Sequence, residues 1–261
     1  TAGRTTLNGE GLQHQDGHSH LLASTIPNCV SYDPTYAYEL AVIIHDGLHR
    51  MYNQGENRFY YITTMNENYI QPEMPPGVED GIIQGMYQFK VSTAPGDLRV
   101  QLLGCGAILR EVEAAAAILE SDYQVAADIW SMTSVNELQR EGKAVQRWNL
   151  LHPEVEPRVP YVTRLLRDTS GPAVAATDYI KAYADQIREF VPGAYTVLGT
   201  DGFGRSDTRS KLREFFEISR EYIVLAALKA LADEGQIENA LVTQAIGALG
   251  IDPDKSNPLT V

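Results

Sequence analysis

The spacing of apolar side chains predicts alternating strands and helices over most of the chain. Apolar residues that recur every three or four positions predict an amphipathic helix over residues 35–52. Apolar, β-branched runs bounded by glycine or proline predict buried strands. These strands are expected over residues 58–67, 98–109, 125–134, 172–179 and 194–204. Further helices are expected over residues 110–123, 135–152, 180–190, 208–216, 220–235 (behind Ser219 as N-cap) and 239–250.

Strands that alternate with helices favour parallel pairing through right-handed crossovers, and so an α/β fold. Residues 72–81, "PEMPPGVEDG", are rich in proline, glycine and acid and are the best candidate for a linker. Residues 1–75 contain too few elements for an independent sheet, whereas residues 76–261 contain enough for a complete α/β domain. We therefore expect two parts that meet near residue 75.

Composition and charge exclude several functional classes. The 261 residues carry a net charge of −13, which argues against binding to the phosphate backbone of nucleic acid or to an anionic membrane surface. The longest apolar stretches are too short to span a bilayer. Cys29 and Cys105 are far apart and form no CxxC pair, so we expect buried thiols and a reducing, cytoplasmic setting. The opening "TAGRTTLNGEG" lacks an initiator methionine and is expected to lie within a longer polypeptide.

The candidate chemistry concentrates in "GLQHQDGHSHLL", which holds half of the six histidines. His14, Asp16, His18 and His20 are possible metal ligands, but their alternating spacing is not a recognised zinc signature. Imidazoles can also donate and accept protons near neutral pH, which suits catalysis or substrate binding. A polar surface turn without chemistry is the alternative.

Three other motifs have simpler interpretations. His45 and His49 share one helix face but lack further ligands, which favours a solvated or interface face. "LLGCGAIL" lacks the third glycine of a dinucleotide fingerprint, so close packing of helix on strand is expected. "GTDGFGRSDTR" follows a strand and suits an anion or interface role, or a turn in which Arg205, Ser206 and Asp207 open a helix.

Several stretches together carry a family resemblance. They are "TAGRTTLNGEGLQHQDGHSH", "IPNCVSYDPTYAYELAVI", "YYITTMNENY", "RWNLLHPEVEPRVPY" and "VLGTDGFGRSDTR". From first residue to last, the chain resembles the C-terminal third of the homodimeric bacterial-type pyruvate dehydrogenase decarboxylating component, of the transketolase superfamily. Transketolase relatives have D-G-P-T-H where this chain has Asp16-Gly17-His18-Ser19-His20.

The resemblance implies a fold and a division of the chain. Residues 1–75 would be the trailing part of the pyrimidine-binding middle domain, and residues 76–261 a transketolase C-terminal-type domain with a mainly parallel sheet flanked by helices. The family's GDG…NN motif is absent, and its activating glutamate lies upstream of this sequence. Thiamine diphosphate and Mg²⁺ would thus be bound mainly outside this chain, with no metal ligand or cofactor-binding residue in it. Alone, the chain would be inactive.

The resemblance also implies site residues and partners. His14 would be catalytic and face the thiazolium and the 2-oxo acid, while Asp16 and His20 would contact substrate oxygens. The whole enzyme would decarboxylate pyruvate and pass acetyl to a lipoyl-bearing dihydrolipoamide acetyltransferase. Its other partners would be the remainder of the enzyme and a second copy in a homodimer. Another thiamine-dependent ketol transferase, or a non-catalytic assembly module, remain alternatives.

Overall fold

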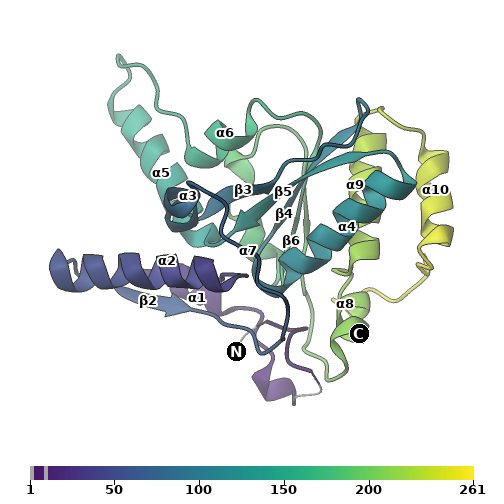
Figure 1. Cartoon of the computed structure of the whole chain (residues 1–261), viewed down its shortest axis with the longest axis horizontal. Helices are drawn as coiled ribbons and strands as arrows, with labels where there is room; N and C mark the ends of the chain where they lie inside the picture. The colour runs from purple at the N-terminus through teal and green to yellow at the C-terminus, as the bar shows by residue number, and fades with distance from the viewer. Residues whose placement is uncertain (1–2, 9–10) are drawn as a thin grey trace.

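The computed structural model describes residues 3–8 and 11–261 and contains two sheets (Figure 1). The large sheet has the order β3-β5-β4-β6-β7. Its strands are β3 (Met86–Lys90), β4 (Arg99–Gly104), β5 (Ala126–Met132), β6 (Ala173–Ala176) and β7 (Tyr195–Leu198). All pairings are parallel except that of the edge strand β3, which is antiparallel to β5. The expected mainly parallel α/β fold is confirmed.

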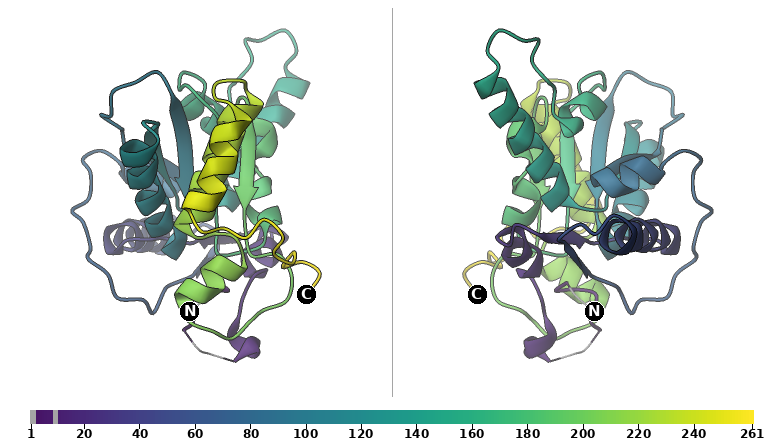
Figure 2. Two further views of the ribbon diagram at one scale, coloured as in Figure 1. Left: turned by 90° about the vertical axis from the view of Figure 1, so that its right-hand side faces the viewer. Right: turned by 90° about the vertical axis from the view of Figure 1, so that its left-hand side faces the viewer.

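Helices cover both faces of the large sheet (Figures 1 and 2). One face carries α4 (Leu109–Asp122), α9 (Arg220–Asp233) and, against α9, α10 (Asn239–Ala248). The other carries α5 (Val135–Leu151), α6 (Tyr161–Leu166) and α7 (Lys181–Asp185). Because successive strand side chains point to opposite faces, Leu102 joins the first core and Leu103 the second. The part of the chain around the large sheet also contains α8 (Arg209–Phe215) and 3₁₀ turns at Gly106–Ile108 and Arg188–Phe190.

The small sheet pairs β1 (Cys29–Tyr32) in parallel with β2 (Phe59–Ile62). Between them runs α2 (Ala37–Leu48), which continues as a π-helix over His49–Asn53. A further helix, α3 (Glu79–Gln84), packs against α2 and leads into β3. The helix expected over residues 35–52 is confirmed, but β2 is shorter than expected and only half-buried.

Five short elements were not assigned from the sequence, namely α1 (Ser19–Ser24), β1, α3, β3 and α6, and α3 begins inside the candidate linker of residues 72–81. Each has six residues or fewer, so the apolar period has no room to repeat. Prolines at positions 27 and 34 also flank β1 and gave that stretch the composition of a turn. Within residues 3–8 and 11–261, no helix is both long enough and apolar enough to cross a membrane.

A buried carboxylate joins the small sheet to the large one. Glu39 of α2 is fully buried, and its Oε2 accepts hydrogen bonds from the backbone N–H groups of Thr35 (2.5 Å) and Tyr36 (3.0 Å). Its Oε1 accepts hydrogen bonds from the Tyr87 hydroxyl (2.7 Å) of β3 and the Ser131 hydroxyl (2.6 Å) of β5. One side chain thus caps the start of α2 and fastens it to two strands of the large sheet.

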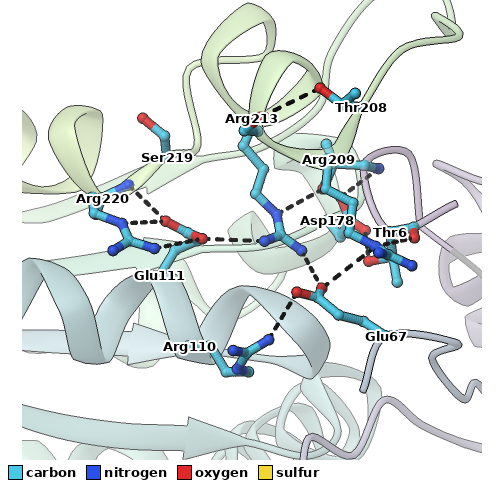
Figure 3. Close-up of polar contacts among 12 residues, drawn as sticks. Thr6, Glu67, Arg110, Glu111, Asp178, Thr208, Arg209, Arg213, Ser219 and Arg220 are labelled. Carbon is cyan, nitrogen blue, oxygen red and sulfur yellow. Dashed lines mark hydrogen bonds and ion pairs between the residues drawn. The ribbon is translucent and has the colours of Figure 1, made fainter. Parts of the chain in front are cut away.

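A cluster of ion pairs forms a second seam between the two parts (Figure 3). The Arg213 guanidinium of α8 lies between Glu67, which follows β2, and Glu111 of α4, at 2.7 and 3.1 Å. Arg110 also pairs with Glu67 at 2.8 Å, and Arg220 pairs with Glu111 at 3.0 Å. Burial opposes ionisation, but the arginines prevail and hold the pKa of both carboxyls below its usual range. We call these five residues the seam cluster.

Candidate active site

The histidine-rich segment is not one loop. A 3₁₀ turn, Leu12–His14, is followed by a short turn and then by α1, which begins at Ser19. The Asp16 carboxylate accepts hydrogen bonds from the backbone N–H groups of His18 (3.0 Å) and Ser19 (2.9 Å), the arrangement of an Asx turn. His14 and His18 therefore precede α1, whereas His20 lies on it.

The three predicted site residues have different environments. His14 is exposed, Asp16 is half-buried, and His20 is buried with 1% of its surface exposed. His14 and Asp16 lie on either side of Gln15 before α1, whereas His20 lies on α1 with its side chain in the protein interior. His14 is therefore the residue of the three that is open to a molecule bound outside this chain.

The His20 imidazole lies in a cage of tyrosine rings from both parts of the chain. Its ring centroid is 5.4 Å from that of Tyr61, 4.7 Å from Tyr179 and 5.0 Å from Tyr183. Its Nε2 lies 3.0 Å from the Thr63 hydroxyl oxygen, and its Nδ1 is buried without a partner. The cage packs α1 against β2, against α7 and against Tyr179, which lies between β6 and α7. The predicted contact of His20 with a substrate oxygen stays a prediction.

A buried polar chain extends from His20 toward the large sheet. The Thr63 hydroxyl donates a hydrogen bond of 2.6 Å to Oδ1 of Asp33, which also accepts a longer one of 3.4 Å from the Tyr179 hydroxyl. Burial raises the pKa of Asp33 to about 7, and Asp33 Oδ2 has no partner. Asp33 and Thr63 were not predicted from the sequence, because Asp33 precedes Pro34 and has the signature of a turn.

Burial of His20 predicts a pH-dependent contribution to stability. Removal from water lowers the pKa of His20 from 6.5 to about 4. Between these pH values the His20 imidazole is protonated in the unfolded chain and neutral in the folded chain. Stability is therefore lost as pH falls through this range, by about 3 kcal/mol in total. Asp33 acts in the opposite direction, because its raised pKa weakens the fold as pH rises from about 4 to about 7.

The variant His20→Phe isolates the histidine term, because it retains an aromatic ring in the cage without a titrating group. Urea unfolding of both proteins at pH 7 and pH 5 is the measurement. The free energy of unfolding should increase more from pH 5 to pH 7 in the wild type than in the variant. Equal pH dependence in the two proteins would contradict the assignment.

The glycine-rich loop after β7 lies against the turn that carries His14. Arg205 N–H donates a 2.6 Å hydrogen bond to the Gln15 side-chain oxygen, and the Gln15 amide nitrogen donates to the Arg205 carbonyl. The expected helix start is corrected by one residue, since Thr208 is the N-cap of α8 and its hydroxyl accepts from Lys211 N–H. Asp207 instead bonds the backbone of Thr208.

The cysteines, the histidine pair His45 and His49, and the turn at Gly104 agree with the structural interpretations given from the sequence. Cys29 and Cys105 are buried, and burial raises the pKa of both thiols. His45 and His49 are exposed on their helix, and Gly104 packs so close to α4 that a Cβ would lie 2.8 Å from Leu109 Cα. Over the part of the chain that the structure describes, no three metal-ligand side chains lie together.

The fold and the sequence can be compared with known proteins. Residues 85–219, just over half of the chain, match the family described as the transketolase-like TK C-terminal domain. The chain belongs to the transketolase-like family. Residues 1–72 of this transketolase-like chain match the pyruvate dehydrogenase E1 component middle domain.

Proteins named pyruvate dehydrogenase E1 component are similar over nearly the whole chain, and the resemblance noted from the sequence is confirmed. The one from Pseudomonas aeruginosa is 62% identical over 99% of this chain, and the one from Cupriavidus necator is 59% identical over 100%. The chain spans 30% and 29% of their respective lengths.

A solved transketolase from Pichia stipitis shares the fold. It superposes with a TM-score of 0.62 at 14% identity, over 90% of this chain and 30% of its own.

Proposed function

We propose that this chain supplies the substrate-facing histidine turn and the C-terminal domain of a pyruvate dehydrogenase decarboxylating component. The observation that supports this most is the 62% identity, over 99% of the chain, to a protein named pyruvate dehydrogenase E1 component. Residues 1–75 would be the trailing part of the middle domain and residues 76–261 the C-terminal domain. The family matches to residues 1–72 and 85–219 support this division.

In this proposal His14 is the catalytic residue of the chain. Thiamine diphosphate, held elsewhere in the enzyme, would supply a carbon nucleophile for the ketone of pyruvate and an electron sink for decarboxylation. Negative charge develops on the ketone oxygen, and an imidazole N–H of His14 can stabilise it by a hydrogen bond. The same ring can move a proton as acetyl passes to the lipoyl group. Asp16 and His20 would assist by contacting substrate oxygens.

The described residues of this chain offer no gathered set of ligands for Mg²⁺. Mg²⁺ needs oxygen ligands gathered at one point, and the described carboxylates do not gather in that way. Oδ1 of Asp16 already accepts hydrogen bonds from two backbone N–H groups. We propose that thiamine diphosphate and Mg²⁺ are bound mainly by residues elsewhere in the enzyme.

The proposed partners are the remainder of the enzyme, a second copy in a homodimer, pyruvate, and the lipoyl-bearing dihydrolipoamide acetyltransferase. We propose that the enzyme acts in the cytoplasm. No nucleic acid or membrane partner is proposed, which agrees with the net charge of −13.

The test is a substrate panel on the full-length protein. Pyruvate should be consumed with release of CO₂ and reduction of an added electron acceptor, and omission of thiamine diphosphate should abolish the reaction. Ketose phosphates are the matched alternative donors, because the fold similarity to transketolases favours a ketol transferase as the second candidate. Turnover of a ketose phosphate with pyruvate inert would overturn the proposal. Turnover of neither donor by cofactor-loaded protein would instead favour an assembly module.

A further inference from the structure

Gln15 ties the turn that carries His14 to a distant loop. Its side-chain amide pairs with both backbone polar groups of Arg205, as a neighbouring strand would. The donor–acceptor distance from Arg205 N–H to Gln15 Oε1 is 2.6 Å. Because amide N–H and C=O groups away from water need partners, this pairing serves Gln15 and the loop alike.

The loop that receives Gln15 is itself held in place. Its Thr200 N–H donates to the Tyr179 carbonyl at 2.8 Å, and the Arg4 guanidinium bonds the carbonyls of Thr200 and Gly202. Gly202 has φ of +99°, and a Cβ there would collide with the Pro258 carbonyl. We call residues 199–205 the glycine loop.

Close packing holds the glycine loop against the histidine turn. A Cβ at Gly204 would lie 2.9 Å from Gln15 Oε1, so the loop approaches Gln15 at a position where side-chain bulk is absent. On the far side of the turn, the Gly17 carbonyl accepts a 3.1 Å hydrogen bond from Ile180 N–H. A Cβ at Gly17 would lie 2.5 Å from Arg4 Nε. The turn is therefore held by contacts at two residues, Gln15 and Gly17.

The exposed His14 imidazole lies next in sequence to these contacts. His14 precedes Gln15 in the chain and ends the 3₁₀ turn Leu12–His14, which lies beside the segment leading into α8 (Figures 1 and 2). Its own side chain is exposed, so its direction depends on the backbone that carries it. Among the neighbours of His14, Gln15 makes the side-chain contacts that fix this backbone to the glycine loop.

We infer that Gln15 is a positioning residue, through which the glycine loop of the C-terminal domain sets the place and direction of His14. The inference rests on the proposed function of His14. It gives the C-terminal domain a part in the reaction, since Arg205, 190 positions away in the sequence, helps to orient the imidazole. A catalytic group displaced by about 1 Å can lose up to a hundredfold in rate, so even a loosened turn should be measurable.

The test is a double-mutant cycle in the full-length enzyme, with pyruvate as substrate. Gln15→Ala should lower kcat by roughly tenfold with little change in KM, because it disturbs orientation and not substrate binding. Gln15→Glu retains the acceptor for Arg205 N–H but loses the donor to the Arg205 carbonyl, so its kcat should fall by less. Gln13→Ala is the matched control, because Gln13 is exposed on the same turn; it should behave as wild type.

Combination with His14→Ala separates positioning from general damage. If Gln15 acts through His14, Gln15→Ala should cause no further loss in the His14→Ala background. Hydrogen exchange over residues 11–18 should also be faster in Gln15→Ala than in wild type, with the rest of the protein unchanged.

The outcomes distinguish the inference from the proposed function. A multiplicative loss in the double variant, or wild-type kcat and exchange in Gln15→Ala, would overturn the positioning role while the role of His14 stands. Normal activity of His14→Ala would overturn the proposed function itself, and the positioning role with it.

Discussion

Replacing His14 by alanine is expected to lower the rate at which the full-length enzyme transfers acetyl from pyruvate to a lipoyl group by about 10²–10⁴-fold. The expected size follows from the loss of a group that moves a proton and stabilises charge on the ketone oxygen. The fold should survive, because the imidazole is exposed and lies outside the cores of both sheets. The measurement is single-turnover acetylation of a lipoyl domain, together with kcat and KM for pyruvate.

His18→Ala is the matched control for this prediction. His18 is another exposed histidine of the same segment, and its side chain makes no capping hydrogen bond to α1. Its removal should leave acetyl transfer within a few-fold of wild type. Near-normal transfer in His14→Ala would remove His14 from the mechanism, and equal losses in both variants would show that the whole segment matters without a special role for His14.

Replacing Glu39 by alanine is expected to destabilise the fold by about 3–5 kcal/mol. The change leaves two backbone N–H groups and the hydroxyls of Tyr87 and Ser131 without their acceptor, in a site closed to water. Burial raises the pKa of the Glu39 carboxyl, and the four hydrogen bonds oppose that rise. Their loss should loosen α2 from the large sheet.

Glu39→Gln provides the comparison, and local hydrogen exchange is the measurement. The glutamine oxygen can still accept from the backbone of Thr35 and Tyr36, while its amide can donate to the two hydroxyls, which also accept. We expect a loss of about 1 kcal/mol for glutamine. Exchange in α2 and β5 of the full-length protein should rise strongly for alanine and slightly for glutamine. Unchanged exchange in Glu39→Ala would show that Glu39 does not join the sheets.

Much of the fold could be predicted from local pattern, because long elements repeat their period. In α4 and α9, apolar residues such as Leu119 and Leu228 recur on one face and pack into the same core. The alternation of strands with helices correctly favoured a parallel sheet, but it gave no sign that β3 would run antiparallel at the edge. Short elements such as α1 have too few residues for a period to appear.

The candidate site was only partly predictable, for a different physical reason. The histidines could be found from their density, yet their environments depend on contacts between residues far apart in the sequence. His20 is buried by Tyr179 and Tyr183. Gln15 meets Arg205, which lies 190 positions later in the sequence. Such pairings leave no local period, so the sequence could name the residues without placing them.

The seam cluster has a consequence for how the two parts respond to their surroundings. The Arg213 side chain is only 7% exposed, and those of Glu111 and Glu67 are 8% and 15% exposed, so dissolved salt screens their attraction weakly. The penalty for keeping ions out of water also falls on heating, while the gain from burying apolar surface levels off. A rise in temperature or in salt concentration should therefore weaken the contact between the two parts less than it would weaken a contact made of surface ion pairs.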